Sequence, residues 1–209
     1  MIEATSKREL NKVRRRAMIV EVATRWFLEN GYAATSMSAI ADEIGGSKAT
    51  LWSHFASKDE LFAAVVDELI GRFSEEISEF LINQTFSITN LKNFLQRFLD
   101  RMMDDPSARL FRLVLGEGER FPEIQDLYWE RGPATMHEHV SDFYGTAFEP
   151  DEARRLARVT IAAITGFRAQ LLIAPPDLMQ SEAKLFVESL VSHLHFPACE
   201  KAQRPSDAS

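Results

Sequence analysis

Cysteine and long uncharged runs are scarce in this sequence of 209 residues. The only cysteine is Cys199, and no stretch without a charged residue is longer than twelve residues. One cysteine cannot form an internal disulfide or a multi-cysteine zinc site. A membrane-spanning helix needs roughly 20 consecutive apolar residues, so we expect no membrane span. The apolar run Met18-Ile19-Val20 is ended at once by Glu21, which argues against a signal peptide. These absences predict a soluble, cytoplasmic protein.

Signals for β-strands are also few. Alternation of apolar and polar residues is not sustained between turn residues, and no Asn-Gly or Asp-Gly pair joins two such runs. Apolar residues instead recur with a period near 3.6, which is typical of amphipathic helices, so we predict an all-α chain. The expected helices cover about 10–30, 36–44, 48–55, 57 to beyond 73, 90–104, 106–119, a segment from 122 with a break at 132–133, 150–173 and 181–195.

Two short helices with a tight turn between them are predicted near the N-terminus. Thr35 or Ser36 can cap the first helix, and Gly45-Gly46 ends it. Ser47 can cap the second helix, which runs to about Phe55. This layout is that of a helix-turn-helix, in which the second helix enters the major groove of DNA with its N-terminal residues nearest the bases.

The charge of the chain is unevenly distributed. The chain carries a net charge of -7, yet residues 1–60 carry +1 and residues 61–209 carry -8. The segment Lys7–Arg16 contains six basic residues and one acidic residue. A locally basic arm on an acidic chain favours a nucleic-acid contact at that arm, although a solvated helix face would have the same composition.

The predicted helix-turn-helix and the basic arm indicate which residues can contact DNA. Lysine side chains can neutralise phosphates, hydroxyls and helix N-termini can hydrogen-bond to them, and the exposed alanine and tryptophan can touch thymine methyl groups. A charged face on a small helical bundle is the competing interpretation. The candidates are Arg16, Thr35, Ser36, Ser47, Lys48, Ala49, Thr50, Trp52, His54 and Lys58.

The stretch from Arg16 to Phe62 resembles the DNA-binding domain of TetR-family transcriptional regulators. The matching elements are Ile19-Val20-x-x-Ala23-x-x-x-Phe27-x-x-x-Gly31-Tyr32-x-x-Thr35-Ser36, Ile40-Ala41, Gly45, Ser47-Lys48-x-Thr50-Leu51-Trp52-x-His54-Phe55 and Ser57-Lys58-x-x-Leu61. The resemblance implies that Lys48, Thr50, Trp52, His54 and Lys58 contact the operator backbone and that Ala49 lies near the bases. Gly46 departs from the family pattern, which usually has a valine that packs the turn. Residues 110–133 resemble the C-terminal domain of the AefR-like branch.

Methionine and aromatic side chains recur through the second half of the chain and can line an adaptable apolar cavity. Glu117, His137 and Arg168 are polar groups that could give such a cavity specificity, although each could equally face solvent. Helical spacing is just as typical of core residues. The ligand-binding candidates are Phe94, Phe98, Met102, Phe111, Leu115, Phe121, Trp129, Met136, His137, Phe143, Phe167 and Arg168.

Signals for catalysis are weak. His137-x-His139 and His193-x-His195 have a spacing of two, which sends the side chains to different faces of a helix and makes a poor metal site. Cys199 lies in a proline-flanked tail without a basic neighbour that would activate it. We therefore expect no enzyme activity, no cofactor and no metal.

The predicted organisation is a helix-turn-helix domain at 1–56, a helical effector-binding and dimerisation domain at 57–197, and a disordered tail at 198–209. Apolar stripes on the last two helices would, as the resemblance implies, meet their copies in a four-helix bundle. The expected function is a ligand-responsive regulator, a repressor that binds palindromic operator DNA as a homodimer and is released by a small apolar or amphipathic effector. A helical adaptor or ligand carrier without operator recognition and a small all-α enzyme are the alternatives. The interface candidates are Leu156, Val159, Thr160, Ala163, Ile164, Phe167, Leu185, Phe186, Ser189, Leu190 and Leu194.

Overall fold

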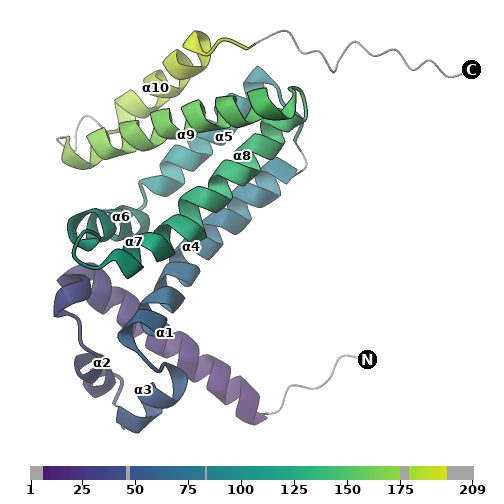
Figure 1. Cartoon of the computed structure of the whole chain (residues 1–209). Helices are drawn as coiled ribbons and strands as arrows, with labels where there is room; N and C mark the ends of the chain where they lie inside the picture. Colours follow the sequence, from purple (N-terminus) through teal and green to yellow (C-terminus); the bar gives the residue numbers. More distant parts are fainter. Residues whose placement is uncertain (1–6, 46–47, 83, 175–178, 197–209) are drawn as a thin grey trace, which may run out of the picture. The chain divides into compact units, whose positions relative to one another are not determined.

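The computed structural model describes residues 7–45, 48–82, 84–174 and 179–196, and within these ranges the chain is helical with no β-strand (Figure 1). The all-α prediction is therefore confirmed. The elements are α1 (Lys7–Ala34), α2 (Met37–Glu43), α3 (Lys48–His54), α4 (Lys58–Ile82), α5 (Ile88–Met102), α6 (Asp105–Glu117), α7 (Pro122–Trp129), the π-helical stretch η1 (Glu130–Ala134), α8 (Thr135–Gly145), α9 (Pro150–Ile173) and α10 (Met179–His193).

The chain forms two compact units, and each is made from two separate stretches of sequence. Unit 1 combines Met1–Gly71 with Arg109–Arg131, and unit 2 combines Arg72–Ala108 with Gly132–Ser209. The division differs from the predicted segments 1–56 and 57–197, because α7, most of α6 and the first half of α4 belong to unit 1. The predicted tail, 198–209, lies outside the described residues.

Unit 1 is held by a core in which α1, α2, α3, α4, α6 and α7 all take part. Its aromatic centre consists of Phe27, Tyr32, Phe62 and Phe121, with ring centroids 5.0 to 5.8 Å apart. Gly31 lies within α1 at φ +81°, so the helix proper is interrupted one residue after Asn30. Glycine reaches this left-handed region without the penalty that a Cβ atom would bring, and the chain can turn towards α2.

Unit 2 is a second helical core in which α9 packs on α8 and α10 packs on α5 (Figure 1). Leu91, Phe94, Leu95 and Phe98 line the inner face of α5, while Ala153, Leu156, Ala157 and Ile161 line that of α9. The N-cap of α5 is Ser87, whose hydroxyl accepts a hydrogen bond from the backbone N–H of Asn90.

The predicted break at residues 132–133 takes the form of η1. Pro133 lies inside this π-helical stretch. Proline has no N–H and clashes with the preceding turn of a regular α-helix, whereas a wider local turn leaves room for the ring. The change from α7 to α8 therefore follows from one proline.

Helix α9 is long and apolar enough, by length and composition alone, to cross a membrane. Its residues Ala153, Leu156, Ala157, Ile161 and Ile164 are nevertheless buried in the core of unit 2. The helix also carries Arg154, Arg155 and Arg158 on its exposed side. We therefore assign α9 as a core helix of a globular unit.

Candidate DNA-binding surface

Helices α2 and α3 are positioned by caps and turns that lie close in sequence. Ser36 is the N-cap of α2, and its hydroxyl accepts a hydrogen bond of 3.2 Å from the N–H of Ala39. The chain leaves α2 through Gly45, at φ +66°. Ser47, the predicted cap of α3, and Gly46, which departs from the family pattern, both lie outside the described residues.

Helix α3 buries one face and exposes the other. Leu51 and the following Phe55 are almost completely buried in the core of unit 1. Lys48 and Ala49 are exposed, and the Trp52 side chain is 49% exposed. Thr50 and His54 are half-buried at the edge of this face. A large indole is left in contact with water beside a lysine, an arrangement suited to a nucleic-acid partner.

Basic residues of α1 converge on the C-terminal end of α3. The guanidinium of Arg16 lies over the ring of Phe55, 4.8 Å from its centroid. Burial lowers the pKa of His54 below its ordinary value, and the positive charges of Lys12, Arg15 and Arg16 lower it further. Lys12 and Arg15 were not among the individual candidates, although they belong to the predicted basic arm. Because α1 is helical from Lys7, the arm is a rigid extension beside α3.

Two predicted DNA contacts, Thr35 and Lys58, are engaged inside unit 1. The buried Thr35 hydroxyl donates to the carbonyls of Gly31 at 2.7 Å and Trp26 at 3.1 Å. Lys58 Nζ donates to the carbonyls of Tyr32 at 2.7 Å and Thr35 at 3.1 Å, and it lies 4.2 Å from the centroid of the Tyr32 ring. Burial lowers the pKa of Lys58. Both side chains therefore hold the turn between α1 and α2, and their contact with DNA stays a prediction.

Glu117, at the end of α6, is hydrogen-bonded to the same turn between α1 and α2. Its carboxylate oxygens accept hydrogen bonds from the N–H groups of Tyr32 at 2.8 Å and Ala33 at 2.7 Å. A Cβ atom on Gly31 would collide with this carboxylate. Glu117 is also one of the polar groups that could give a ligand cavity specificity. The structure shows that its carboxylate ties α6 to the start of the helix-turn-helix.

Further carboxylates fix α2 and α4 to α1. Glu43, at the end of α2, accepts hydrogen bonds from the side chains of Arg25 and Trp26. Asp59, in the first turn of α4, accepts a hydrogen bond from the Tyr32 hydroxyl. Burial and the adjacent Asp59 raise the pKa of Tyr32 far above its ordinary value, so its hydroxyl remains a donor. Helices α1, α2 and α4 are therefore joined by charge-assisted hydrogen bonds as well as by the core.

The predicted ligand-binding residues are distributed over the two units. Phe111, Leu115, Phe121 and Trp129 belong to unit 1, where Leu115 and Trp129 are exposed. The others belong to unit 2, and five of these are buried core side chains. These five are Phe94, Phe98, Met102, Met136 and Phe143.

The polar candidates of unit 2 have partners of their own. Arg168 is buried, and its Nη2 donates to the carbonyl of Ser107 at 2.7 Å. His137 is half-buried. Burial lowers its pKa, and the positive charge of Arg158 lowers it further.

Phe167, the remaining ligand candidate of unit 2, stacks on Phe186 with ring centroids 4.0 Å apart, and this contact joins α9 to α10.

The predicted interface residues separate into a buried set and an exposed set. Leu156, Thr160 and Ile164 are buried within unit 2, and the Thr160 hydroxyl is hydrogen-bonded to Tyr144 at 2.8 Å. These three therefore support the unit's own core. Val159 is 53% exposed and Leu185 is 57% exposed.

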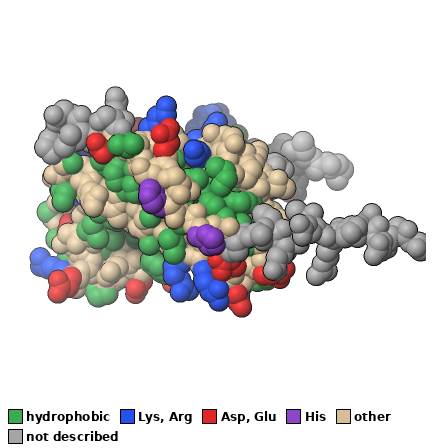
Figure 2. Space-filling view, turned by 90° about the horizontal axis from the view of Figure 1, so that it is seen from above, with side chains coloured by type: hydrophobic (Ala, Val, Ile, Leu, Met, Phe, Trp, Pro, Cys, Tyr) green, Lys and Arg blue, Asp and Glu red, His purple; other side chains and the backbone are tan. Residues whose placement is uncertain are grey.

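The other interface candidates lie at the surface or at its edge. Ser189 is exposed, and Ala163, Phe167, Phe186, Leu190 and Leu194 are half-buried. Figure 2 views the molecule from the end where α9 and α10 lie in Figure 1, and it shows hydrophobic side chains exposed between charged ones. These residues, with Val159 and Leu185, are the interface candidates that lie at or near the surface of unit 2, and the interface stays a prediction.

Metal ligands are not gathered in the part of the chain that the structure describes. No group of three or more His, Cys, Asp or Glu side chains there could hold a metal ion.

Two family models match the chain. Residues 19–65 match the model described as bacterial regulatory proteins, tetR family, and residues 89–192 match the C-terminal domain of AefR-like transcriptional repressors. Together these matches cover the helix-turn-helix and most of the remaining helices.

Curated relatives match mainly over part of their length. The nucleoid occlusion factor SlmA of Pasteurella multocida is 29% identical over 119 residues, which are 57% of this chain and 58% of SlmA. The transcriptional activator FasR of Mycolicibacterium smegmatis is 31% identical over 100 residues, 48% of this chain and 45% of FasR. The chain thus spans about half the length of the curated relatives it matches.

Solved structures match over nearly their whole length. A TetR-family regulator from Mesorhizobium loti superposes with a TM-score of 0.75 at 21% identity, covering 87% of this chain and 95% of that one. The flavonoid-responsive regulator FrrA superposes with a TM-score of 0.67 at 25% identity, covering 86% and 94%. The first likeness concerns the fold alone.

The tie made by Glu117 is open to a direct test. We expect Glu117→Gln to lower the free energy of unfolding by about 1–2 kcal/mol, since two hydrogen bonds lose a charged acceptor. Urea unfolding of the full-length protein measures this change. Glu119→Gln, a neighbouring exposed carboxylate, is the matched control. Equal stability of the two variants would contradict the role given to Glu117.

The charge around His54 predicts a titration. In an NMR titration, His54 is expected to have a pKa below 6.5, and Lys12→Ala and Arg15→Ala should each raise it, because a positive neighbour disfavours the imidazolium. Lys7→Ala, at the start of α1, serves as the control. If neither substitution changes the pKa of His54, the basic arm does not approach α3 in solution.

Proposed function

Because the chain belongs to the TetR family of bacterial regulatory proteins, we propose that it is a ligand-responsive transcriptional regulator that binds double-stranded DNA as a homodimer. The observation that carries this proposal is the exposed face of α3, with Lys48, Ala49 and Trp52, beside the basic residues of α1. Sequence, local charge and exposure favour the same surface. Since DNA is the proposed partner, we place the protein in the cytoplasm.

The residues of the surface divide into two roles. Lys48, Arg16 and the neighbouring Lys12 and Arg15 would neutralise phosphates, which supplies affinity without sequence preference. Ala49 and Trp52 would face base edges in the major groove, where thymine methyl groups offer apolar contacts. The Ser36 hydroxyl, at the exposed N-terminus of α2, would add a phosphate contact together with the N–H groups of that helix.

A homodimer would bring two copies of α3 to one operator. One helix of seven residues makes few contacts, so a second copy on the other half of a palindrome adds affinity and fixes the spacing of the half-sites. The exposed apolar residues of α9 and α10, including Val159 and Leu185, support an interface at these helices. A two-fold interface buries the same surface on both copies.

Regulation by a ligand would act on the position of the reading helices. A small apolar or amphipathic effector that binds one conformer better shifts the population towards that conformer. Within unit 1, Glu117 of α6 is hydrogen-bonded to the turn that precedes α2. A displacement of α6 would therefore move α2 and α3. We propose repression as the sign of regulation, in line with the AefR-like match, although the relative FasR is named an activator.

The experiment that tests this function is fluorescence anisotropy with DNA that flanks the protein's own gene, compared with scrambled DNA at several salt concentrations. The proposal predicts tighter binding to the flanking DNA and a steep loss of affinity as salt rises. Binding equal to that of scrambled DNA would instead favour an adaptor or ligand carrier that lacks operator recognition.

Lys48 and Ala49 should respond differently to substitution. Lys48→Ala should weaken binding to flanking and scrambled DNA alike and reduce the salt slope by about 1, because one phosphate contact is lost. Ala49→Gln should change the preferred sequence instead. Lys92→Ala, an exposed lysine on α5, is the control. A change of sequence preference alone in Lys48→Ala would refute its assignment to a phosphate.

The interface is tested by placing charge on its exposed apolar residues. We expect Val159→Glu combined with Leu185→Glu to convert the dimer to a monomer in light scattering and to lower DNA affinity at least tenfold. Ile88→Glu, at another exposed apolar position of unit 2, should leave the dimer intact. A double variant that stays dimeric would move the interface elsewhere.

A further inference from the structure

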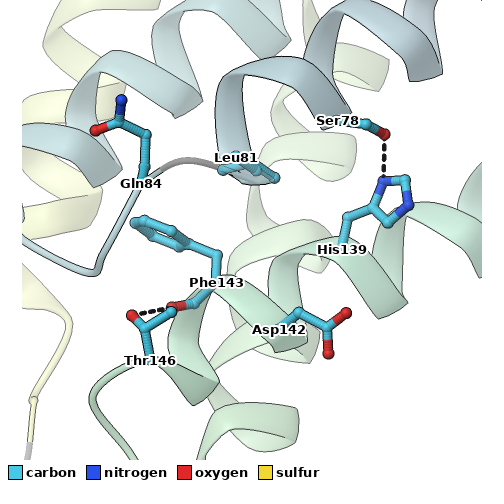
Figure 3. Close-up of a pocket in the computed structure, with 7 residues that line it drawn as sticks. All are labelled: Ser78, Leu81, Gln84, His139, Asp142, Phe143 and Thr146. Atoms are coloured by element: carbon cyan, nitrogen blue, oxygen red, sulfur yellow. Dashed lines mark hydrogen bonds between the residues drawn. The ribbon is translucent and has the colours of Figure 1, made fainter.

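Unit 2 contains a cavity whose position differs from that expected from the predicted ligand-binding residues. It lies between the end of α4, the turn that follows it and the outer part of α8, and its volume is about 260 Å³ (Figure 3). Seven of the residues that the structure describes line it, and Phe143 is the one predicted ligand contact among them. The lining residues are Ser78, Leu81, Gln84, His139, Asp142, Phe143 and Thr146.

The cavity has an apolar base and a polar rim. Leu81 and Phe143 are core residues that are almost completely buried, so they offer hydrocarbon and one aromatic ring to an occupant. The other five lining residues carry hydroxyl, amide, imidazole or carboxylate groups. Apolar walls with a few convergent polar groups are the usual composition of small-molecule sites.

Several polar groups of the rim are already engaged. Ser78 Oγ and His139 Nδ1 are 2.9 Å apart and share a hydrogen bond. The Thr146 hydroxyl donates to the carbonyl of Phe143 and accepts from the N–H of Phe86, both at 2.8 Å. These bonds brace α8 against α4 and the turn after it, so the walls are formed before any ligand arrives.

Two groups of the rim remain available. Neither the amide of Gln84 nor the carboxylate of Asp142 has a hydrogen-bond or ion-pair partner among the described side chains. Among the described residues that line the cavity, Asp142 is the only acidic one and none is a lysine or an arginine. An anionic occupant would be repelled by this carboxylate, whereas a cationic one would gain a charge-assisted hydrogen bond.

The volume limits the size of the occupant. It equals the liquid volume of roughly nine water molecules, which is room for one ring with a short side chain. A ring of this size can pack against Leu81 and Phe143. Asp142 is exposed at the edge of the cavity, with its carboxylate directed away from these two side chains, so it would bind the amino group of an occupant at that edge (Figure 3).

We propose that this cavity binds a small amphipathic amine, with a single ring and a protonated amino group, and that this amine is the effector. The inference rests on the proposed regulatory function for the effector role, while the binding itself depends only on unit 2. Asp142 is the residue that selects the cation, and Gln84 can orient the ligand through a neutral hydrogen bond.

The test is isothermal titration calorimetry of the full-length protein with 2-phenylethylamine, 2-phenylethanol and phenylacetate, which share a ring and differ in charge. We expect the amine to bind up to about fivefold more tightly than the alcohol, since an ion pair with an exposed carboxylate contributes little more than that, and phenylacetate to bind more weakly still. Asp142→Asn should abolish the preference for the amine. Glu138→Gln, an exposed carboxylate one turn away on α8, should retain it.

Each alternative result overturns a distinct part of the inference. Equal binding of amine and alcohol, or the same loss in both variants, would remove Asp142 as the selecting group. If no probe binds, the cavity is not a ligand site.

The effector role is tested by fluorescence anisotropy with operator DNA, measured with and without the amine. If the protein binds DNA with the same affinity with and without bound amine, the effector role is wrong, whereas the regulator proposal is unaffected. Absent DNA binding would overturn the regulator proposal without affecting the calorimetric result.

Discussion

The hydrogen bonds between the Glu117 carboxylate and the N–H groups of Tyr32 and Ala33 are the constraint on which unit 1 depends. They form where Gly31 turns the chain out of α1 at positive φ, and Lys58 binds the carbonyls on the other side of the same turn. One anion and one cation thus bind the backbone of this short segment. The direction in which α2 leaves α1, and with it the placement of α3, follows from this arrangement.

This constraint explains how a mostly acidic chain presents a basic surface. With the turn fixed, α3 lies beside the first turns of α1, and Lys12, Arg15 and Arg16 act together on His54. The negative charge of the chain is concentrated after residue 60, so the arm is the main source of attraction for a polyanion. The same carboxylate belongs to α6, so the turn that orients the proposed reading helix is also the place where α6 meets the helix-turn-helix.

Local features could be predicted from sequence, whereas distant partners could not. The cap at Ser36, the break at Pro133 and the span of α9 depend on neighbouring residues, and the structure has each of them. The sequence assigns Lys58 to a phosphate contact because lysine neutralises phosphates and because of the family resemblance, but it does not reveal the carbonyl partners of Lys58, which lie 23 and 26 residues away. Glu117 is 84 and 85 residues from its partners, which no spacing rule reaches. Helical periodicity likewise marks the side chains that turn inward, but it does not show that Phe143, a buried core residue like Phe94, also lines a cavity.

The central claim is that α3 and the first turns of α1 form one DNA-binding surface. Amide hydrogen exchange of the full-length protein, measured free and with DNA from the region flanking its own gene, tests this most directly. The account predicts that protection on DNA binding is concentrated in residues 7–16 and 36–55. Unchanged exchange in these segments despite saturating DNA, or protection found only in α8 and α9, would contradict it.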